Sequence, residues 1–259
     1  MSIWGKIIGG AAGFALHGPL GALLGAAAGH AIDKMRGGRT DELPGGAGDA
    51  MATVDGTDPR AATKQVAFTI AVIALGAKMA KVDGLVTRDE VDAFKQVFRV
   101  PDAEMENVGR VFDQARHSPL GFEAYARQIA AMFRRQRTVL EELLDGLFHI
   151  AKADGRVTDD EIAYLKDVAA IFGFSETDFG RIRASHLGPD AADPYNVLGI
   201  TRETTDIAIK AAYRKLVREN HPDRLIAKGV PKEFIDVATG KLAAINAAYD
   251  KVAKERDLR

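Results

Sequence analysis

The tripeptide His221-Pro222-Asp223 constrains the fold more than any other feature, because it separates two segments whose apolar residues have helical spacing. Proline cannot continue a helix and pushes the residue before it out of the helical region. The tripeptide is therefore predicted to lie in a loop between two packed helices, with its polar side chains available to a partner. The apolar stripes of the two helices are Ile209, Ala212, Tyr213 and Leu216 before the tripeptide, and Phe234, Ala238, Leu242, Ile245, Tyr249 and Val252 after it.

Two further signals complete this C-terminal unit. Asp193 before Pro194 is a favourable start for a short helix, and Gly199 can end it. On the helix before the tripeptide, Lys210, Arg214 and Arg218 recur at intervals of four residues and form a positively charged row. We expect a short first helix followed by two long antiparallel helices, the first of which displays this basic row.

The C-terminal stretches resemble the DnaJ family of co-chaperones. The matching sequences are Asp193-Pro-Tyr-Asn-Val-Leu-Gly-Ile200, Ile209-Lys-Ala-Ala-Tyr-Arg-Lys-Leu216, His-Pro-Asp and Ile245-Asn-Ala-Ala-Tyr249. The resemblance implies a J domain that docks on the chaperone Hsp70 (DnaK) and accelerates ATP hydrolysis by Hsp70. It assigns docking to Lys210, Tyr213, Arg214, Lys215 and Arg218 on the helix and to His221, Pro222 and Asp223 at the tripeptide.

Two features of the sequence depart from the simplest form of this expectation. Tyr213 falls on the apolar stripe and is expected to contribute to the core as well as to docking. Arg224-Leu225 follows the tripeptide, whereas most J domains have Lys-Asn there. The chain therefore lacks the asparagine that the resemblance would supply.

The composition narrows the classes of function. The chain has 259 residues, a formal net charge of −1 and no cysteine. A net charge near zero gives no overall attraction to nucleic acid, and the lack of cysteine excludes disulfides, thiolate metal sites and cysteine catalysis. His117, His149 and His186 have no catalytic spacing. We therefore expect a protein that is not an enzyme, has no cofactor and does not bind nucleic acid.

The N-terminal segment is predicted to be a membrane anchor. Residues 7–31 contain no Asp, Glu, Lys or Arg, and a helix of that length can cross a hydrocarbon core of about 30 Å. A cleaved signal peptide is the main alternative, because Lys6 precedes the apolar stretch and small residues follow at 26–28. Lys34, Arg36 and Arg39 follow the segment, so a single span would leave the C-terminal domains in the cytoplasm.

Glycines repeat within the predicted span. Gly21, Gly25 and Gly29 lie four residues apart and would line one helix face, where small residues allow a second backbone to approach closely. A homodimer through this helix is one interpretation, and glycine enrichment in a low-complexity anchor is the other. Residues 34–61, rich in Gly, Pro and Asp, follow as a predicted flexible linker.

An internal repeat defines the region between the linker and the J domain. Residues 80–91 align without gaps to residues 151–162, at a constant offset of 71. Each copy has a helix that ends near Asp-Gly, followed by Thr-x-x-Glu, the pattern of a capping box that begins the next helix. The repeat predicts two related helical hairpins within an all-α domain of about seven helices.

This duplicated pattern resembles the TerB domain of bacterial tellurite-resistance proteins over about residues 62–185. The resemblance suggests a divalent-cation site whose ligands would be carboxylate oxygens of Asp83, Glu90, Asp154 and Glu161. Helix caps and turns already account for all four residues. Metal binding is therefore the weaker interpretation.

The order of segments resembles the DjlA type of membrane-anchored DnaJ-like co-chaperone. The predicted architecture is an anchor at 1–33, a linker at 34–61, a TerB-like domain at 62–185, a second linker at 186–192 and a J domain at 193–259. The resemblance implies a single-pass protein of the bacterial inner membrane that recruits Hsp70 to the cytoplasmic face of that membrane. The alternative is a membrane-tethered metal or stress sensor whose J domain serves as its output.

Overall fold

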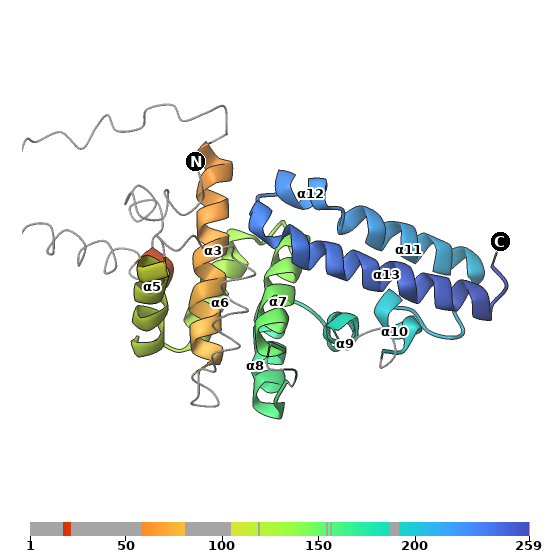
Figure 1. The fold of residues 1–259 in the computed structure, drawn as a ribbon, viewed down its shortest axis with the longest axis horizontal. Helices are drawn as coiled ribbons and strands as arrows, with labels where there is room; N and C mark the ends of the chain where they lie inside the picture. The colour runs from red at the N-terminus through yellow and green to blue at the C-terminus, as the bar shows by residue number, and fades with distance from the viewer. Residues whose placement is uncertain are drawn as a thin grey trace, which may run out of the picture.

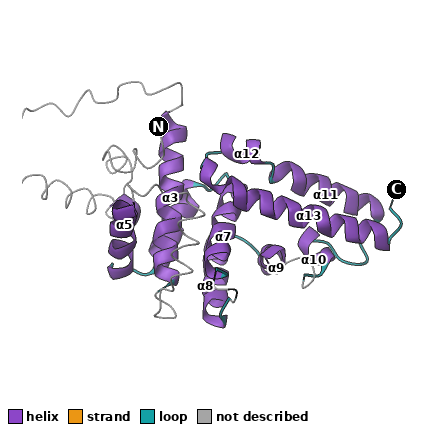
Figure 2. Cartoon of the chain, in the orientation of Figure 1, coloured by secondary structure: helices purple, strands orange, loops and turns teal. Residues whose placement is uncertain are grey.

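The computed structural model describes residues 18–21, 59–80, 105–118, 120–153, 155, 157–186 and 192–258. Every element that it places in these ranges is helical, and the described chain forms a group of upright helices with a second group lying across one end (Figures 1 and 2). The predicted all-α fold is confirmed for this part of the chain.

The middle domain is built around α3 (Pro59–Met79), which packs against three other helices. Its residues from Ala67 to Met79 are all buried, as expected for a stretch in which only Thr69 and Lys78 are polar. The other helices are α5 (Met105–His117), α6 (Phe122–Met132), α7 (Arg137–Ala151), α8 (Asp159–Ile171) and α9 (Glu176–His186). The predicted helices before each copy of the repeat correspond to α3 and α7.

The second copy of the repeat forms the predicted capping box. Thr158 is the N-cap of α8 and accepts a hydrogen bond from the Glu161 backbone N–H, while the Glu161 carboxylate accepts one from the Thr158 backbone N–H at 2.8 Å. These bonds satisfy amide groups that a helix start would otherwise leave without partners. The first copy, with Thr87 and Glu90, lies outside the described residues.

The J domain contains the three predicted helices, α10 (Pro194–Leu198), α11 (Asp206–Glu219) and α13 (Ile235–Glu255), and two short helical segments between α11 and α13. The short segments are α12 (Pro222–Ala227) and the 3-10 helix η2 (Lys232–Phe234). Asp193 caps α10 and Gly199 ends it in the left-handed conformation at φ 66°, as predicted. α11 and α13 lie antiparallel, side by side (Figure 1).

The buried stripe of α13 differs from the prediction. Leu242 and Tyr249 are only half buried, whereas Lys241 and Ala248 are buried. Positions 234, 238, 241, 245, 248 and 252 alternate at steps of four and three, which also keeps them on one helix face, slightly rotated from the predicted stripe. The charge of Lys241 keeps this position out of a stripe defined by apolar residues.

The two domains do not have fully separate cores. One cluster of buried residues contains Ile209, Leu216 and Ile245 of the J domain, and it includes Ala184 from α9. The larger cluster belongs to the middle domain, but five J-domain residues are part of it: Leu225, Val230, Phe234, Val237 and Ala238. The J domain is therefore packed into the middle domain from the end of the tripeptide to the start of α13.

Only residues 18–21 of the predicted membrane segment are described. Leu20 is fully buried in the middle-domain core, and its backbone N–H donates to Oε1 of Gln128 on α6 at 2.9 Å. None of the described helices combines the length with the apolar character that a bilayer crossing requires.

Candidate functional site

The His-Pro-Asp tripeptide lies at the junction of α11 and α12. α11 ends at Glu219, and the buried Asn220 side chain donates from Nδ2 to the Leu216 carbonyl at 2.8 Å. His221 is the N-cap of α12, with φ −66° and ψ 128°, and its Nδ1 accepts a hydrogen bond from the Asp223 backbone N–H at 3.3 Å. The junction is thus held by a cap on each side.

This geometry corrects the prediction that the whole tripeptide lies in a loop. Only His221 is outside a helix, whereas Pro222 and Asp223 form the first turn of α12. Proline cannot continue α11, but its fixed φ suits the first position of a new helix. The predicted exposure is confirmed, because 50% of the His221 side chain and 88% of the Asp223 side chain are accessible to solvent.

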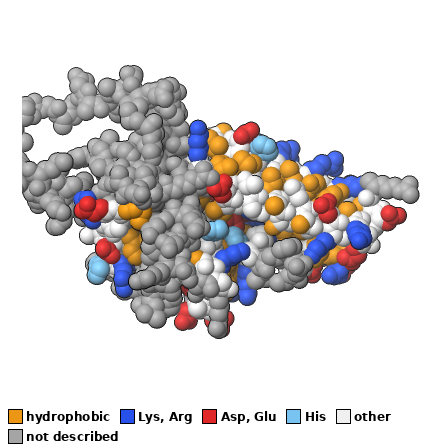
Figure 3. Space-filling model, in the orientation of Figure 1, with side chains coloured by type: hydrophobic (Ala, Val, Ile, Leu, Met, Phe, Trp, Pro, Cys, Tyr) orange, Lys and Arg blue, Asp and Glu red, His pale blue; other side chains and the backbone are white. Residues whose placement is uncertain are grey.

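A shallow apolar groove of about 290 Å³ lies beside the tripeptide. Its arginines contribute their apolar stems to the groove while their guanidinium groups reach solvent. Lys and Arg side chains are spread along the α11 side of the J domain on the face drawn in Figure 3. The groove is lined by Tyr213, Arg214, Val217, Arg218, His221 and Arg224. This surface suits a partner that offers an apolar side chain surrounded by acidic groups.

Tyr213 also connects α11 to α13. Its ring stacks on that of Tyr249 with centroids 3.9 Å apart, and its hydroxyl donates to Oδ1 of Asn246 at 3.1 Å. The predicted contribution of Tyr213 to packing is confirmed. It therefore forms one wall of the groove and one contact between the two long helices.

Lys215 does not lie with the other predicted docking residues. It is exposed, but it lines a second cavity of about 310 Å³ between α11 and the middle domain, together with Asp178 and Arg181 of α9. Lys210, Arg214 and Arg218 remain one helical turn apart on another part of the α11 surface. The structure therefore divides the predicted set between two surfaces.

The described residues provide no geometry for the weaker metal interpretation. Glu161 is buried and its Oε2 accepts from the Thr158 backbone N–H at 2.8 Å and from the Thr158 hydroxyl at 2.9 Å. Among the described residues, no group of three His, Asp or Glu side chains is arranged to hold an ion. The other three candidate ligands, Asp83, Glu90 and Asp154, lie outside the described residues.

Of the glycines predicted to form a dimer contact, Gly21 is buried, and Gly25 and Gly29 lie outside the described residues.

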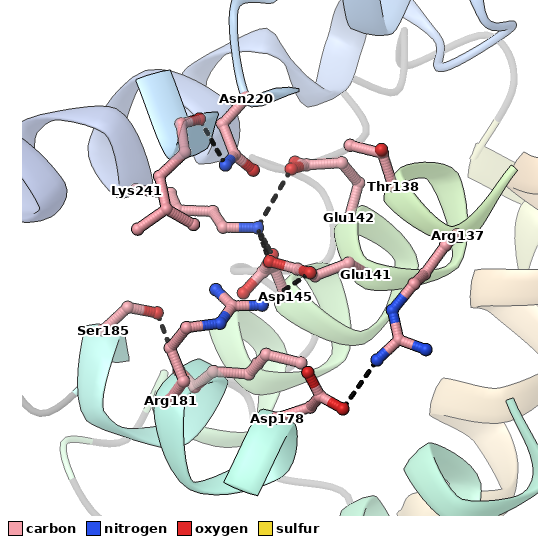
Figure 4. A network of polar contacts seen from close by, with 12 residues as sticks. Arg137, Thr138, Glu141, Glu142, Asp145, Asp178, Arg181, Ser185, Asn220 and Lys241 are labelled. Carbon is pink, nitrogen blue, oxygen red and sulfur yellow. Dashed lines mark hydrogen bonds and ion pairs between the residues drawn. The ribbon is translucent and has the colours of Figure 1, made fainter. Parts of the chain in front are cut away.

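A buried charge cluster between the two domains was not predicted. Lys241 of α13 has 1% of its side chain exposed, and its Nζ lies 2.6 Å from Oε1 of Glu141, 2.7 Å from Oδ2 of Asp145 and 3.2 Å from Oε1 of Glu142 (Figure 4). All three carboxylates come from α7 of the middle domain. A single lysine of the J domain therefore holds three acidic groups of the other domain.

Two side chains of α9 extend this cluster. Nη2 of Arg181 lies 2.7 Å from Oε2 of Glu141, and Nε2 of His186 lies 2.7 Å from Oδ1 of Asp145. The His186 ring also stacks on Phe148 with centroids 4.9 Å apart. The charge cluster comprises Glu141, Glu142, Asp145, Arg181, His186 and Lys241.

Burial and pairing act in opposite directions on the acidic groups. Burial raises the pKa of Glu142 to about 7, and attraction to Lys241 offsets this effect only in part. Oε2 of Glu142 is buried and has no hydrogen-bond partner among the described residues. Burial would also raise the pKa of Asp145, but Lys241 and His186 bring it down to about 2. With a proton on Glu142, the two remaining carboxylates, Glu141 and Asp145, are matched by the two cations Arg181 and Lys241.

Sequence patterns contained a signal for this cluster. α7 carries Glu141, Glu142 and Asp145 within an otherwise apolar helix, and Lys241 occupies a core position of α13. Buried carboxylates need a cationic or hydrogen-bonding partner. Acidic residues in a buried helix therefore predict a lysine or arginine on the element packed against them, although not which one.

Comparisons with known proteins agree with the segment order. Three family models match: the co-chaperone DjlA transmembrane domain at residues 1–48, tellurite resistance protein TerB at 69–184 and the DnaJ domain at 193–256. A co-chaperone protein DjlA from Photobacterium profundum is 30% identical and covers 99% of this chain and 100% of its own length. Proteins of the same name from Coxiella burnetii and Yersinia pestis are each 28% identical and cover 98% and 100% of both chains, respectively. No solved structure matches significantly.

Proposed function

This chain belongs to the DjlA family of membrane-anchored co-chaperones, and we propose that its J domain docks on an Hsp70 and stimulates ATP hydrolysis by that chaperone. In this proposal the chain is a regulator and performs no ATP hydrolysis of its own. The observation that carries the proposal is the exposure of His221 and Asp223 at the start of α12, beside an apolar groove with arginines at its edge.

The surface supports a two-part contact. Lys210, Arg214 and Arg218 would attract an acidic surface of Hsp70 and orient the encounter, because complementary charge increases the rate of association. The groove beside Tyr213 would then accept an apolar side chain, which fixes the position of the tripeptide against Hsp70. Solvent-exposed charge pairs are screened by salt, so docking should weaken as ionic strength rises.

The N-terminal segment would place this activity at a membrane. We propose a single crossing of the bacterial inner membrane with the middle and J domains in the cytoplasm, where Hsp70 and ATP are available. Lys34, Arg36 and Arg39 after the apolar segment support this orientation. Glycines at 25 and 29 support a homodimer through the membrane helices, whereas Gly21, at the start of the same row, is buried in this structure.

A single-turnover ATPase assay tests the docking proposal. The full-length chain in detergent is added to Hsp70 loaded with ATP, and the rate is measured over a range of chain concentrations. His221→Gln should abolish stimulation with little change in the thermal unfolding of the chain, because His221 is exposed, is absent from both buried clusters and contributes a single cap hydrogen bond. His117→Gln, the same change at an exposed histidine of α5, should stimulate like the unmodified chain.

Charge reversal tests the basic row separately. Arg214→Glu should raise the half-saturating concentration by about tenfold, equivalent to about 1.4 kcal/mol. Arg183→Glu makes the same reversal at an exposed position of α9 and should have little effect. Full stimulation by a folded His221→Gln chain would refute the proposed function, whatever the result for Arg214.

A further inference from the structure

We infer that the middle domain positions the His-Pro-Asp tripeptide, because the segment that follows the tripeptide is built into the middle-domain core. This inference rests on the proposed function of the J domain. It assigns Leu225, Phe234 and Lys241 as positioning residues that act through the tripeptide without contacting Hsp70. It also gives the middle domain a direct effect on how strongly a bound Hsp70 is stimulated.

The first observation is the burial of Leu225. It lies two residues after Asp223 in the same short helix, is fully buried, and belongs to the core cluster of the middle domain. Two residues of α-helix span only about 3 Å along the axis. A shift of the middle domain against Leu225 would therefore move Asp223 almost equally. Most J domains have asparagine at this position. In this chain the position is occupied by a leucine that packs into the middle-domain core.

The second observation is the packing of Phe234 at the far end of the same segment. Phe234 is fully buried, and its ring meets that of Phe68 on α3 edge to face with centroids 4.7 Å apart. It also covers Gly146 of α7, where an added Cβ would lie 2.7 Å from Cε1 of the phenylalanine ring. Only glycine at position 146 allows this approach. Between these two anchors, Nζ of Lys228 donates to the Thr138 hydroxyl at 2.9 Å.

The third observation is the charge cluster, which determines how α13 lies on α7. Nζ of Lys241 is within 3.2 Å of oxygen atoms from Glu141, Glu142 and Asp145, and it is almost completely removed from solvent. Buried charges tolerate few alternative arrangements, because any other packing leaves a carboxylate without its cation. The cluster therefore favours a single orientation of the J domain, in which the tripeptide remains exposed.

These contacts predict a specific kinetic signature. The basic row that attracts Hsp70 lies on α11, whereas the anchors lie after the tripeptide. A fault in positioning should lower the maximal stimulation of bound Hsp70 and leave the half-saturating concentration unchanged. A misplacement of about 1 Å in a reacting geometry can cost up to about 100-fold, so a partial misplacement is expected to cost about tenfold.

The first variant changes the middle domain only, and every variant is assayed as the full-length chain in detergent. Gly146→Ala should displace the Phe234 ring and lower maximal stimulation of Hsp70 about tenfold at an unchanged half-saturating concentration. Adding Phe234→Leu to Gly146→Ala should restore stimulation, because the smaller side chain makes room for the methyl group. Leu165→Ala, at a fully buried position of α8, is the matched control: it destabilises the middle domain without altering these anchors.

Circular dichroism melting first establishes that each variant is folded at the assay temperature. If Gly146→Ala does not fold, Leu225→Ala and Phe234→Leu test the same anchors and should each lower maximal stimulation. Unchanged maximal stimulation in the folded anchor variants, or an equal loss in Leu165→Ala, would overturn the inference. Neither result would affect the proposed function, which fails only if His221→Gln still stimulates Hsp70.

Discussion

Replacing Lys241 by Met should destabilise the whole chain strongly, because the substitution leaves buried carboxylates without their main cation. Glu141 would retain Arg181 and Asp145 would retain His186, but Lys241 is the only cation within 4.0 Å of Glu142 among the described residues. Breaking a buried ion pair by removing one partner typically costs about 3–5 kcal/mol. Methionine fills a similar volume, so little of this cost comes from an empty cavity.

The expected loss is large enough to measure by chemical denaturation. For an m value of about 2 kcal/mol/M in urea, a loss of about 4 kcal/mol lowers the unfolding midpoint by about 2 M. Urea unfolding of the full-length chain in detergent, followed by far-ultraviolet circular dichroism, gives this midpoint directly. Lys254→Met provides the matched control, since Lys254 is exposed on the same helix. Its free energy of unfolding should differ from that of the unmodified chain by less than about 0.5 kcal/mol.

The shape of the transition carries further information. Both domains share the larger core cluster, so the unmodified chain should unfold in one cooperative step. Lys241→Met removes the polar part of the interface but leaves the shared apolar core, so the variant should still unfold in one step, at a lower urea concentration. A single transition shifted by no more than that of Lys254→Met would show that the cluster contributes nothing to joining the domains, and our reasoning about buried charge would be refuted.

Local signals predicted most of the secondary structure because they depend on neighbouring residues only. The cap at Asp193, the left-handed turn at Gly199 and the capping box of Thr158 with Glu161 formed as expected. Each is a short-range pattern in which a side chain or a glycine satisfies a helix end. The same kind of pattern predicted a helix boundary at the tripeptide, although it did not predict that Pro222 begins a helix.

Contacts between the two domains could not be predicted in the same way. A helical stripe identifies which side of α13 is buried, but it does not identify the core that each position joins. Phe234 and Ile245 lie on the same face, yet Phe234 packs into the middle domain and Ile245 packs into the J domain. Lys241 lies between them, and a stripe defined by apolar residues does not include a lysine. A buried lysine becomes plausible only once Glu141, Glu142 and Asp145 are known to face it.

Two further predictions concern topology and pH. Ser2→Cys and Thr201→Cys are introduced singly, since the chain has no cysteine of its own. An impermeant maleimide should label only Ser2→Cys in intact cells. Labelling of Thr201→Cys would show that the C-terminal domains lie outside the cytoplasm. Burial raises the pKa of Glu142 from 4.5 to about 7, so the folded chain holds this proton more tightly than the unfolded chain. The resulting stability is present below about pH 4.5 and is lost as pH rises to about 7, a change of about 3 kcal/mol. Glu142→Gln removes this proton site, and subtracting its unfolding free energy from that of the unmodified chain at each pH cancels the contributions of distant groups. The difference in unfolding free energy between the unmodified chain and Glu142→Gln should fall between pH 5 and 8. In this range Glu142 ionises beside Glu141 and Asp145, and Lys241 is the cation that it contacts. A difference that stays constant with pH would contradict the raised pKa.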